Sequence, residues 1–568
     1  MKTKNIKNSL CPTLCIALSV LVFTACSDLL TEETYGKHNS DTYFENTEKL
    51  EMALNGVYAI FNRQDLYGQY WMVYDCDTDI SHINGSGTGH VARDLGHYNT
   101  YTEHSWLQES WISYYEGIDR ANTILEKKED VQIEDEADQK LFDRLVAQTK
   151  VLRAMCFFDL TLLWGDVPMK LTPSKASEDF MQPQTPRDEV YAQIITDLEE
   201  AIPDLSWHDE AGQQYERISK GAAMGLLARA YLYRGGYSLH NNNGVGTMKR
   251  PDNYQEYYRK AQSVLNELIN SGKHSLLEGE TVDGEFRSGY EKTFRNMCET
   301  IYNPYENICE FSFFTPTGQN YGSFMGTYNG PEISDQSIYG RANSFIKTHC
   351  FFYDMFEDAD LRKEVAIATF SINASSEIVE IERLKSQNWA PGKWRRNWHT
   401  NTVKNNNLTD VNWVVLRYAD VLLMSAEVEN ELNDGPNDTA IERTNQVRRR
   451  AFGKPYLTKN TEVDLKQSDF SGKEDFFTFL TEERARELCF EGLRRQDLIR
   501  WNLLEKAIRN THEQFLDYFN AANGNSYIFR AGEFFTPGKH ELYPIPAREV
   551  RETKGALIQN PGYTNAEE

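Results

Sequence analysis

Apolar side chains recur with a helical period between residues 220 and 236. They fall at positions i, i+3, i+4 and i+7, which is one face of an α-helix: Met224, Leu227, Ala228 and Tyr231. Gly235 and Gly236 follow this face and are expected to end the helix. A second helical face follows at Tyr257, Ala261, Val264, Leu265 and Leu268. The pattern therefore predicts two consecutive helices that pack as a pair.

Two more helix pairs have a similar layout. Segment 141–164 is followed by 186–201, where Pro186 suits the first helical turn, and segment 415–432 is followed by 439–451. The pairs resemble tetratricopeptide units in length and in their alternation of small and large residues. Because the array is interrupted, we expect a mostly α-helical scaffold of tetratricopeptide-like pairs, an α-α superhelix, and not a regular solenoid.

Helical periodicity is mostly lost between about residues 276 and 410, where Gly, Asn, Tyr and Trp dominate. Loops on a rigid scaffold carry binding residues, and a long irregular insertion in a helical protein is itself a sign of function. Pro544 and Pro546 exclude a helix near the C-terminus, so that segment should lie extended against the scaffold. We expect one domain over 41–568, with helical scaffold at about 41–275 and 411–510, a loop-rich lobe at about 276–410, and an extended segment at about 511–568.

The N-terminus has the pattern of an export signal that ends in a cysteine. Lysines at positions 2, 4 and 7 precede an apolar run over 14–23, which is too short to span a bilayer. Thr24 and Ala25 then lead to Cys26, with Phe23 where leucine is more usual. This order resembles the lipobox of bacterial lipoproteins, which implies cleavage before Cys26 and acylation of its thiol. We expect 1–25 to be a signal peptide and 26–40 a lipid-anchored tether; the alternative is an ordinary secretory signal.

The charge of the 568-residue chain excludes some classes of partner. Its formal net charge is −25, which repels the phosphates of nucleic acids and anionic headgroups. We therefore expect no nucleic-acid partner, and membrane attachment only through the lipid anchor. The cysteine spacings match no zinc pattern. Cys156 and Cys489 are expected to be buried thiols, and pairing of Cys298 with Cys309 remains open.

No motif indicates catalysis, a metal or a cofactor. The glycines of the GSGTG sequence, Gly85, Gly87 and Gly89, lack the Lys-Ser/Thr of a phosphate loop and are expected to form a flexible ligand loop. Three alternating aspartates from Asp75 resemble the start of a calcium-binding EF-hand. However, Ile80 and Ser86 stand where that loop needs Gly and Glu. The histidines near His97 lack zinc-site spacing, and no carboxylate pair can be singled out as a glycosidase dyad.

Exposed aromatic residues are the best candidates for ligand binding. An aromatic ring stacks on the apolar C–H face of a sugar, while Arg, Asp and Asn bond the hydroxyl groups. Segment 67–101 supplies the candidates Trp71, Tyr74, Asp75, Arg93, Tyr98 and Tyr101. The loop-rich lobe supplies Tyr321, Tyr328 and Trp394. The alternative is that such aromatics form a small core beneath long loops.

Charged residues beside apolar helical faces are expected to form structural ion pairs, because buried charges are normally paired. These residues are Arg417, Asp420, Glu427, Arg484, Glu487, Glu491, Arg494 and Asp497. We interpret them as scaffold residues and not as catalytic carboxylates.

An ordered series of motifs runs through the chain. It comprises Leu152-Arg153-Ala154, Trp164-Gly165-Asp166-Val167-Pro168, Leu416-Arg417-Tyr418-Ala419-Asp420, Phe490-Glu491-Gly492, Tyr543-Pro544-Ile545-Pro546 and Asn560-Pro561-Gly562-Tyr563. In this order and spacing the series resembles the SusD/RagB family of outer-membrane nutrient-binding lipoproteins. One departure is Arg495-Gln496, where the family tends to place an aromatic residue first.

The resemblance implies a non-catalytic, lipid-anchored protein that binds glycans on the outside of the outer membrane. It also implies a partner, a SusC-like TonB-dependent transporter that receives the oligosaccharide. In this family the early segment contributes to the glycan site together with loops of the later irregular region. Two alternatives remain: a peptide ligand, as in RagB-type members, and a surface glycoside hydrolase, which has no support beyond scattered acidic residues.

Overall fold

The computed structural model describes residues 43–175, 181–314, 322–400, 407–520 and 529–564. The long helices are α2 (Thr47–Phe61), α5 (Ser105–Lys127), α6 (Glu136–Trp164), α7 (Arg187–Ala201), α8 (Lys220–Gly235), α9 (Tyr254–Asn270), α13 (Tyr418–Leu432), α14 (Asp438–Ala451), α15 (Lys473–Leu488) and α17 (Leu504–Phe515). The shorter helices are α3 (Tyr70–Tyr74), α4 (Val91–Gly96), α10 (Gly289–Cys298), α11 (Cys350–Tyr353), α12 (Arg362–Ala366), α16 (Arg494–Arg500), α19 (Ala531–Phe534) and α20 (Ala547–Glu552). The fold is mostly α-helical, as the sequence predicts.

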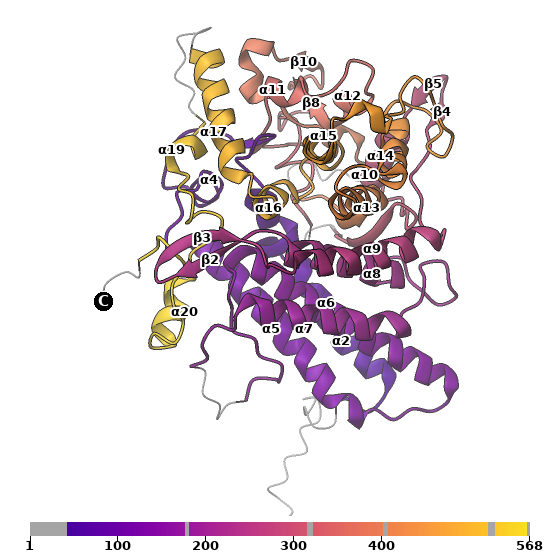
Figure 1. Cartoon of the computed structure of the whole chain (residues 1–568), viewed down its shortest axis with the longest axis vertical. Helices are drawn as coiled ribbons and strands as arrows, with labels where there is room; N and C mark the ends of the chain where they lie inside the picture. Colours follow the sequence, from indigo (N-terminus) through magenta and orange to yellow (C-terminus); the bar gives the residue numbers. More distant parts are fainter. Residues whose placement is uncertain (1–42, 176–180, 315–321, 401–406, 521–528, 565–568) are drawn as a thin grey trace, which may run out of the picture.

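The long helices form a layered stack in which each packs on the next. Contacts run from α2 to α5, then through α6, α7 and α8 to α9, which packs on α13; α13 in turn contacts α14 and α15. In Figure 1 the helices α2 and α5 to α9 fill the lower half, and α13 to α16 lie above them. The three predicted helix pairs are therefore confirmed as neighbours.

Local sequence explains where these helices begin and end. Asp135 caps α6 by accepting from the backbone nitrogens of Ala137 and Asp138, and Ser219 caps α8 by accepting from Ala222. Helix α8 ends at Gly235, as predicted. The prediction of a helix from residue 415 is wrong for its first three residues, because 415–417 belong to a strand. The run Trp413–Arg417 is rich in β-branched and aromatic residues, which favour a strand.

The strands occur in short two-stranded antiparallel pairs across the described residues. The pairs are β1 (His82–Ile83) with β7 (Ile346–Lys347), β2 (Ser238–Asn242) with β3 (Val245–Lys249), β4 (Glu280–Val282) with β5 (Glu285–Arg287), β6 (Asn307–Phe311) with β12 (Trp413–Arg417), β8 (Ile367–Ala368) with β11 (Ala390–Pro391), and β9 (Phe370–Ile372) with β10 (Ile378–Glu380). Most of them lie in the lobe over 276–410, with α11, α12, β8 and β10 at the top of Figure 1. The same range also contains the short helices α10, α11 and α12.

The C-terminal segment is not simply extended, because it contains the end of α17 together with α19 and α20. The part from Tyr543 to Pro546 is non-helical and buried, as its prolines predict. Its position is fixed by Trp164 at the end of α6. The Trp164 indole donates to the Pro544 carbonyl at 3.0 Å, and the Asn560 amide donates to the Trp164 carbonyl at 2.9 Å. Three distant motifs of the sequence, those that begin at Trp164, Tyr543 and Asn560, therefore meet at one point.

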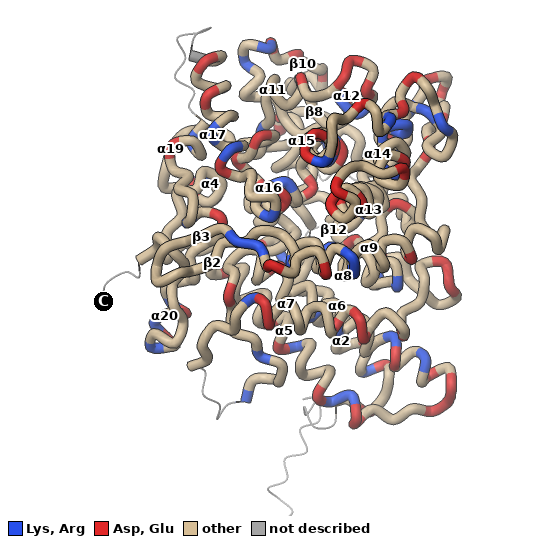
Figure 2. Tube along the Cα trace, in the orientation of Figure 1, with Lys and Arg blue, Asp and Glu red and all other residues tan. Residues whose placement is uncertain are grey.

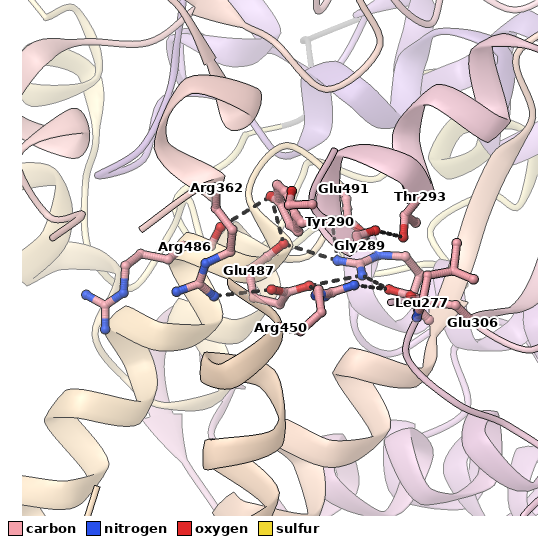
Figure 3. A network of polar contacts seen from close by, with 12 residues as sticks. Leu277, Gly289, Tyr290, Thr293, Glu306, Arg362, Arg450, Arg486, Glu487 and Glu491 are labelled. Carbon is pink, nitrogen blue, oxygen red and sulfur yellow. Dashed lines mark hydrogen bonds and ion pairs between the residues drawn. The ribbon is translucent and has the colours of Figure 1, made fainter. Parts of the chain in front are cut away.

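A buried network of ion pairs joins the helical scaffold to the loop-rich lobe (Figure 3). Arg417 pairs with Glu306, Glu487 and Glu491 at 3.0, 3.0 and 2.7 Å, and all four side chains are at most 5% exposed. The buried members of the network are five cations and five carboxylates: Arg362, Lys393, Arg417, Arg450 and Arg486 with Glu306, Asp360, Glu483, Glu487 and Glu491. Burial alone would raise the pKa of Glu483, but the Arg362 guanidinium lowers it to about 2. Glu483 is therefore an ionised scaffold group.

The remaining predicted charges are also paired. Arg484 bonds Asp420 and Asp497, Arg500 bonds Glu427, and Arg494 bonds Asp79. Figure 2 shows basic and acidic positions side by side at α15 and α16. The prediction that these groups are structural ion pairs is confirmed.

The six cysteines from Cys76 to Cys489 are all free and buried, so Cys298 and Cys309 are not joined. Within the described ranges no helix combines the length and the apolar character that crossing a bilayer requires. Nor do three or more His, Cys, Asp or Glu side chains gather there as metal ligands would.

Candidate ligand-binding surface

Pairing of two very short strands brings the two predicted binding regions together. In the antiparallel pair of β1 and β7, His82 lies opposite Lys347 and Ile83 lies opposite Ile346. The backbone continues the pairing for one more residue, because the Asn84 nitrogen donates to the Phe345 carbonyl at 2.9 Å. The loop that follows β1 therefore lies directly beside Phe345.

A row of aromatic rings crosses this junction. The rings of Tyr328 and Phe345 are stacked, with centroids 4.9 Å apart and an interplanar angle of 19°. Phe324 meets Tyr328 edge-on at 5.1 Å, and the His90 ring lies 5.3 Å from Phe345. Tyr328, Phe345 and Phe324 are half-buried and His90 is exposed. These four residues and Arg93 are called the Arg93 surface below.

Arg93 lies on α4 and is held in place by the loop beneath it. Its guanidinium carbon is 5.3 Å from the centroid of the Phe345 ring, a cation–π arrangement. Its Nε donates to the Asn84 carbonyl at 2.7 Å, and its Nη2 donates to Asn84 Oδ1 at 3.2 Å. Because a guanidinium carries five N–H donors, this half-buried group still has donors to offer to a ligand.

The glycine-rich loop over 85–90 is exposed and is fixed at both of its ends. Gly85 and Gly89 have φ values of +78° and +83°, a conformation that favours glycine. The Gly89 nitrogen donates to Asp94, with its nearer oxygen at 3.0 Å, and the Gly85 carbonyl accepts from His97 Nε2 at 3.1 Å. Side chains at Gly87 or Gly89 would meet open space, while Arg530 Nε donates to the Ser86 carbonyl of the loop at 2.9 Å.

His97 connects this loop to the protein interior. Its Nδ1 lies 2.7 Å from Asp77 Oδ2, and Asp77 also accepts from the Ile83 nitrogen at 2.7 Å. Burial lowers the pKa of His97, but the charge and hydrogen bond of Asp77 outweigh it and leave that pKa above its usual value. A protonated imidazole donates from both nitrogens, which matches an acceptor on each side of the ring.

Of the nine predicted ligand contacts, the structure brings together Arg93 and Tyr328. Tyr101 is 41% exposed and packs near His104, with ring centroids 5.3 Å apart. Tyr321 lies outside the described residues, as does the predicted lipid-attachment residue Cys26.

We expected five other predicted ligand contacts to be exposed, but the structure buries them, and this part of the prediction is wrong. They are Trp71, Tyr74, Asp75, Tyr98 and Trp394, all of them buried. Each of these side chains makes its contacts inside the protein. The Trp71 indole donates to the Gly492 carbonyl at 3.3 Å, and the Trp394 indole to the Met297 sulfur at 3.3 Å. The Asp75 carboxylate accepts from the Arg495 nitrogen at 2.9 Å.

Tyr74 and Tyr98 are buried against the C-terminal part of the chain. The Tyr74 hydroxyl bonds Ser110 Oγ at 2.7 Å, and its ring lies 5.3 Å from Tyr543. The Arg495 guanidinium lies over Tyr98, 5.7 Å from its centroid. Packing from far along the chain decides the burial of these aromatics.

Phe324, Phe345 and His90 were absent from the predicted site. Phe345 and the first β7 residue, Ile346, give only a weak strand signal, and His90 appears in the sequence only as part of a histidine cluster without metal-site spacing. The Arg93 surface offers stacking faces and hydrogen-bond donors, which suit recognition of a ring-shaped polar ligand.

Comparison with known proteins identifies related families and structures. A model described as the SusD family matches residues 311–563, and a model described as "Starch-binding associating with outer membrane" matches residues 28–232. SusD-like protein P2 of Formosa agariphila is 25% identical over 559 residues, covering 96% of this chain and 98% of its own. SusD-like protein P25 of the same organism is 26% identical, covering 94% and 95%.

Solved structures share the whole fold. A SusD homolog from Bacteroides thetaiotaomicron superposes with a TM-score of 0.82 at 29% identity, covering 92% of this chain and 98% of its own. A structure titled "Laminarin binding SusD-like protein" superposes with a TM-score of 0.67 at 23% identity, covering 92% and 100%. The second likeness shows the fold alone.

Proposed function

The chain belongs to the SusD/RagB family, and from this premise we propose that it is a cell-surface lipoprotein that captures glycans. The observation that carries the proposal is the Arg93 surface. Partly exposed rings of Tyr328 and Phe345 stand beside an arginine with donors to spare. The relatives named for starch and laminarin bind ligands that such a surface suits.

Attachment through Cys26 is the second part of the proposal. The family model named for association with the outer membrane matches from residue 28, two residues after Cys26. A diacylglycerol on Cys26 would tether the protein at that membrane, with the tether over 26–40 leading to the folded domain. The Arg93 surface would then face the cell exterior.

Delivery to a SusC-like TonB-dependent transporter is the third part. Binding by stacking and hydroxyl contacts needs no proton transfer, so the glycan would leave chemically unchanged. Exposed, solvated contacts give modest affinity, and weak capture allows the cargo to be passed on. The proposed role is therefore binding and transfer without catalysis.

A ligand screen of the purified full-length protein tests the class of function. Titration calorimetry would be run with starch, laminarin, xylan, mannan and a set of peptides, and the products would be examined by chromatography. We expect heat from at least one polysaccharide and no new reducing ends. Binding of peptides alone would support the RagB-like alternative, and release of reducing sugar would support a glycoside hydrolase.

A further inference from the structure

A second group of exposed aromatic residues borders a hollow that none of the Arg93 surface residues lines. The hollow has a volume of about 190 Å³ and lies where the chain leaves α10 and enters β6. Its rim carries Tyr302, 37% exposed, and Phe314, 67% exposed. Apolar side chains so exposed contribute little to the core, and clusters of them mark binding sites.

Tyr215 extends the aromatic rim from a different part of the chain. Its ring is 56% exposed and lies 6.3 Å from Tyr302, with 31° between the ring planes. The Tyr302 hydroxyl bonds Ser312 Oγ at 3.1 Å, which fixes the ring while leaving a face open. Two tyrosines in this arrangement form a shallow platform beside the hollow.

The floor of the hollow supplies polar groups. Glu310, on β6, and Asn412, just before β12, both line it, together with Thr300. Glu310 accepts from the Asn307 amide at 3.2 Å, and burial raises the pKa of its carboxyl to about 7. A protonated carboxyl donates to a sugar hydroxyl and an ionised one accepts from it, so Glu310 can bond a hydroxyl in either state.

We propose that this hollow is a second saccharide-binding site, which takes a neutral sugar ring against Tyr302 and hydrogen-bonds its hydroxyls through Glu310 and Asn412. The proposal rests on glycan binding as the proposed function and adds a site to it. None of the described residues lining the hollow is Lys or Arg, whereas Glu310 and Asp410 line it. An acidic floor without cations repels phosphate and acidic sugars, so a neutral sugar is the expected ligand.

Gly68 links the two binding surfaces. Its carbonyl accepts from the nitrogen of Phe324 on the Arg93 surface at 2.8 Å. On the other side, a Cβ placed on Gly68 would lie 3.4 Å from Phe313, which lines the hollow. One polysaccharide that reaches both surfaces would bind more tightly than a short fragment, because the second contact becomes intramolecular.

The test compares full-length variants by affinity electrophoresis in gels containing laminarin or starch, with melting temperatures measured in parallel. In the gel that slows the wild type, we expect Tyr302→Ala to weaken the apparent affinity for the polysaccharide about tenfold. A loss of this size is typical of one stacking contact. Tyr302→Phe should retain binding, because the ring face is kept. Tyr305→Ala is the matched control, since Tyr305 is 50% exposed nearby but does not line the hollow.

A second comparison separates this site from the Arg93 surface. The Arg93→Ala/Tyr328→Ala protein should keep weak retention, and adding Tyr302→Ala should remove what is left. Tyr302→Ala is therefore made in the wild type and in the Arg93→Ala/Tyr328→Ala protein. If the folded variants are retained as strongly as their parents in both cases, the second site is wrong, while the proposed function still stands. If the unsubstituted protein binds neither glucan nor any glycan of the wider panel, both conclusions fall together.

Discussion

The guanidinium carbon of Arg93 lies 5.3 Å from the centre of the Phe345 ring, although the two residues come from different halves of the chain. The contact exists because β1 and β7 pair immediately beside it. It places a planar cation and a stacking face on one partly exposed surface. The proposed glycan binding depends on this arrangement.

The ionisation of His97 should control the order of the glycine-rich loop. His97 faces acceptors at Asp77 and Gly85, while Arg530 and His82 are the other charged or titratable groups acting on it. Its pKa is raised above 6.5 in the folded protein, so its stabilising effect is complete below about pH 6.5. The effect is lost as the pH rises through the folded pKa.

NMR titration of the His97 ring and melting curves at several pH values measure this effect. We expect the stability difference between the wild type and His97→Gln to shrink as the pH increases. If the wild type and His97→Gln differ in stability by the same amount at pH 6 and pH 9, or if the His97 ring has a pKa below 6.5, a charged His97 is contradicted.

Removal of Arg417 should strongly destabilise the fold. The substitution Arg417→Met leaves Glu487 and Glu491 buried with fewer partners, which typically costs about 3–5 kcal/mol. Chemical denaturation measures the loss. Lys140→Ala, at an exposed ion pair with Glu136, is the control and should show no measurable change. Similar denaturation midpoints for both variants would show that the network carries little stability.

Alanine substitutions of the buried aromatics should lower stability more than the same substitution of an exposed one. Trp71 is 6% exposed and Trp394 is 3% exposed, so Trp71→Ala and Trp394→Ala each create a cavity and should cost about 3–5 kcal/mol of unfolding free energy. Tyr101→Ala, at a 41% exposed position, should leave the melting temperature almost unchanged. If a tryptophan variant melts like the wild type, its ring is not part of the core.

Sequence periodicity predicted the helices of the scaffold but did not predict which residues form the Arg93 surface. The repeating faces of α8 and α9 are visible within a few residues, because a helix is stabilised by neighbours along the chain. The pairing of β1 with β7 involves two-residue strands from distant segments, and no local pattern encodes it. The residues around Trp71 and Phe345 do not show in the sequence which of the two rings is buried. Long-range packing places Trp71 in the core and leaves Phe345 partly exposed.

The proposed lipid anchor at Cys26 gives a prediction that is independent of the ligand. Cys26→Ala removes the thiol that diacylglycerol would modify, so the variant should be found uncleaved or unanchored. Cell fractionation with a blot for the protein makes the measurement, and Cys76→Ala, at a buried thiol, is the control. A Cys26→Ala protein that is cleaved and still sediments with membranes would contradict the anchor.

Titration calorimetry of the Arg93→Ala/Tyr328→Ala protein with the polysaccharide bound by the wild type tests the central claim most directly. Binding should weaken by about 1–3 kcal/mol for each of the two truncated side chains, as at a binding hot spot. A melting curve recorded in parallel shows whether the variant, which also loses the Asn84 bonds and the stacking on Phe345, is folded. Arg551→Ala/Phe286→Ala, which truncates an exposed arginine and an exposed ring elsewhere, is the matched control and should bind as the wild type does. A folded Arg93→Ala/Tyr328→Ala protein with wild-type affinity would show that the glycan binds elsewhere.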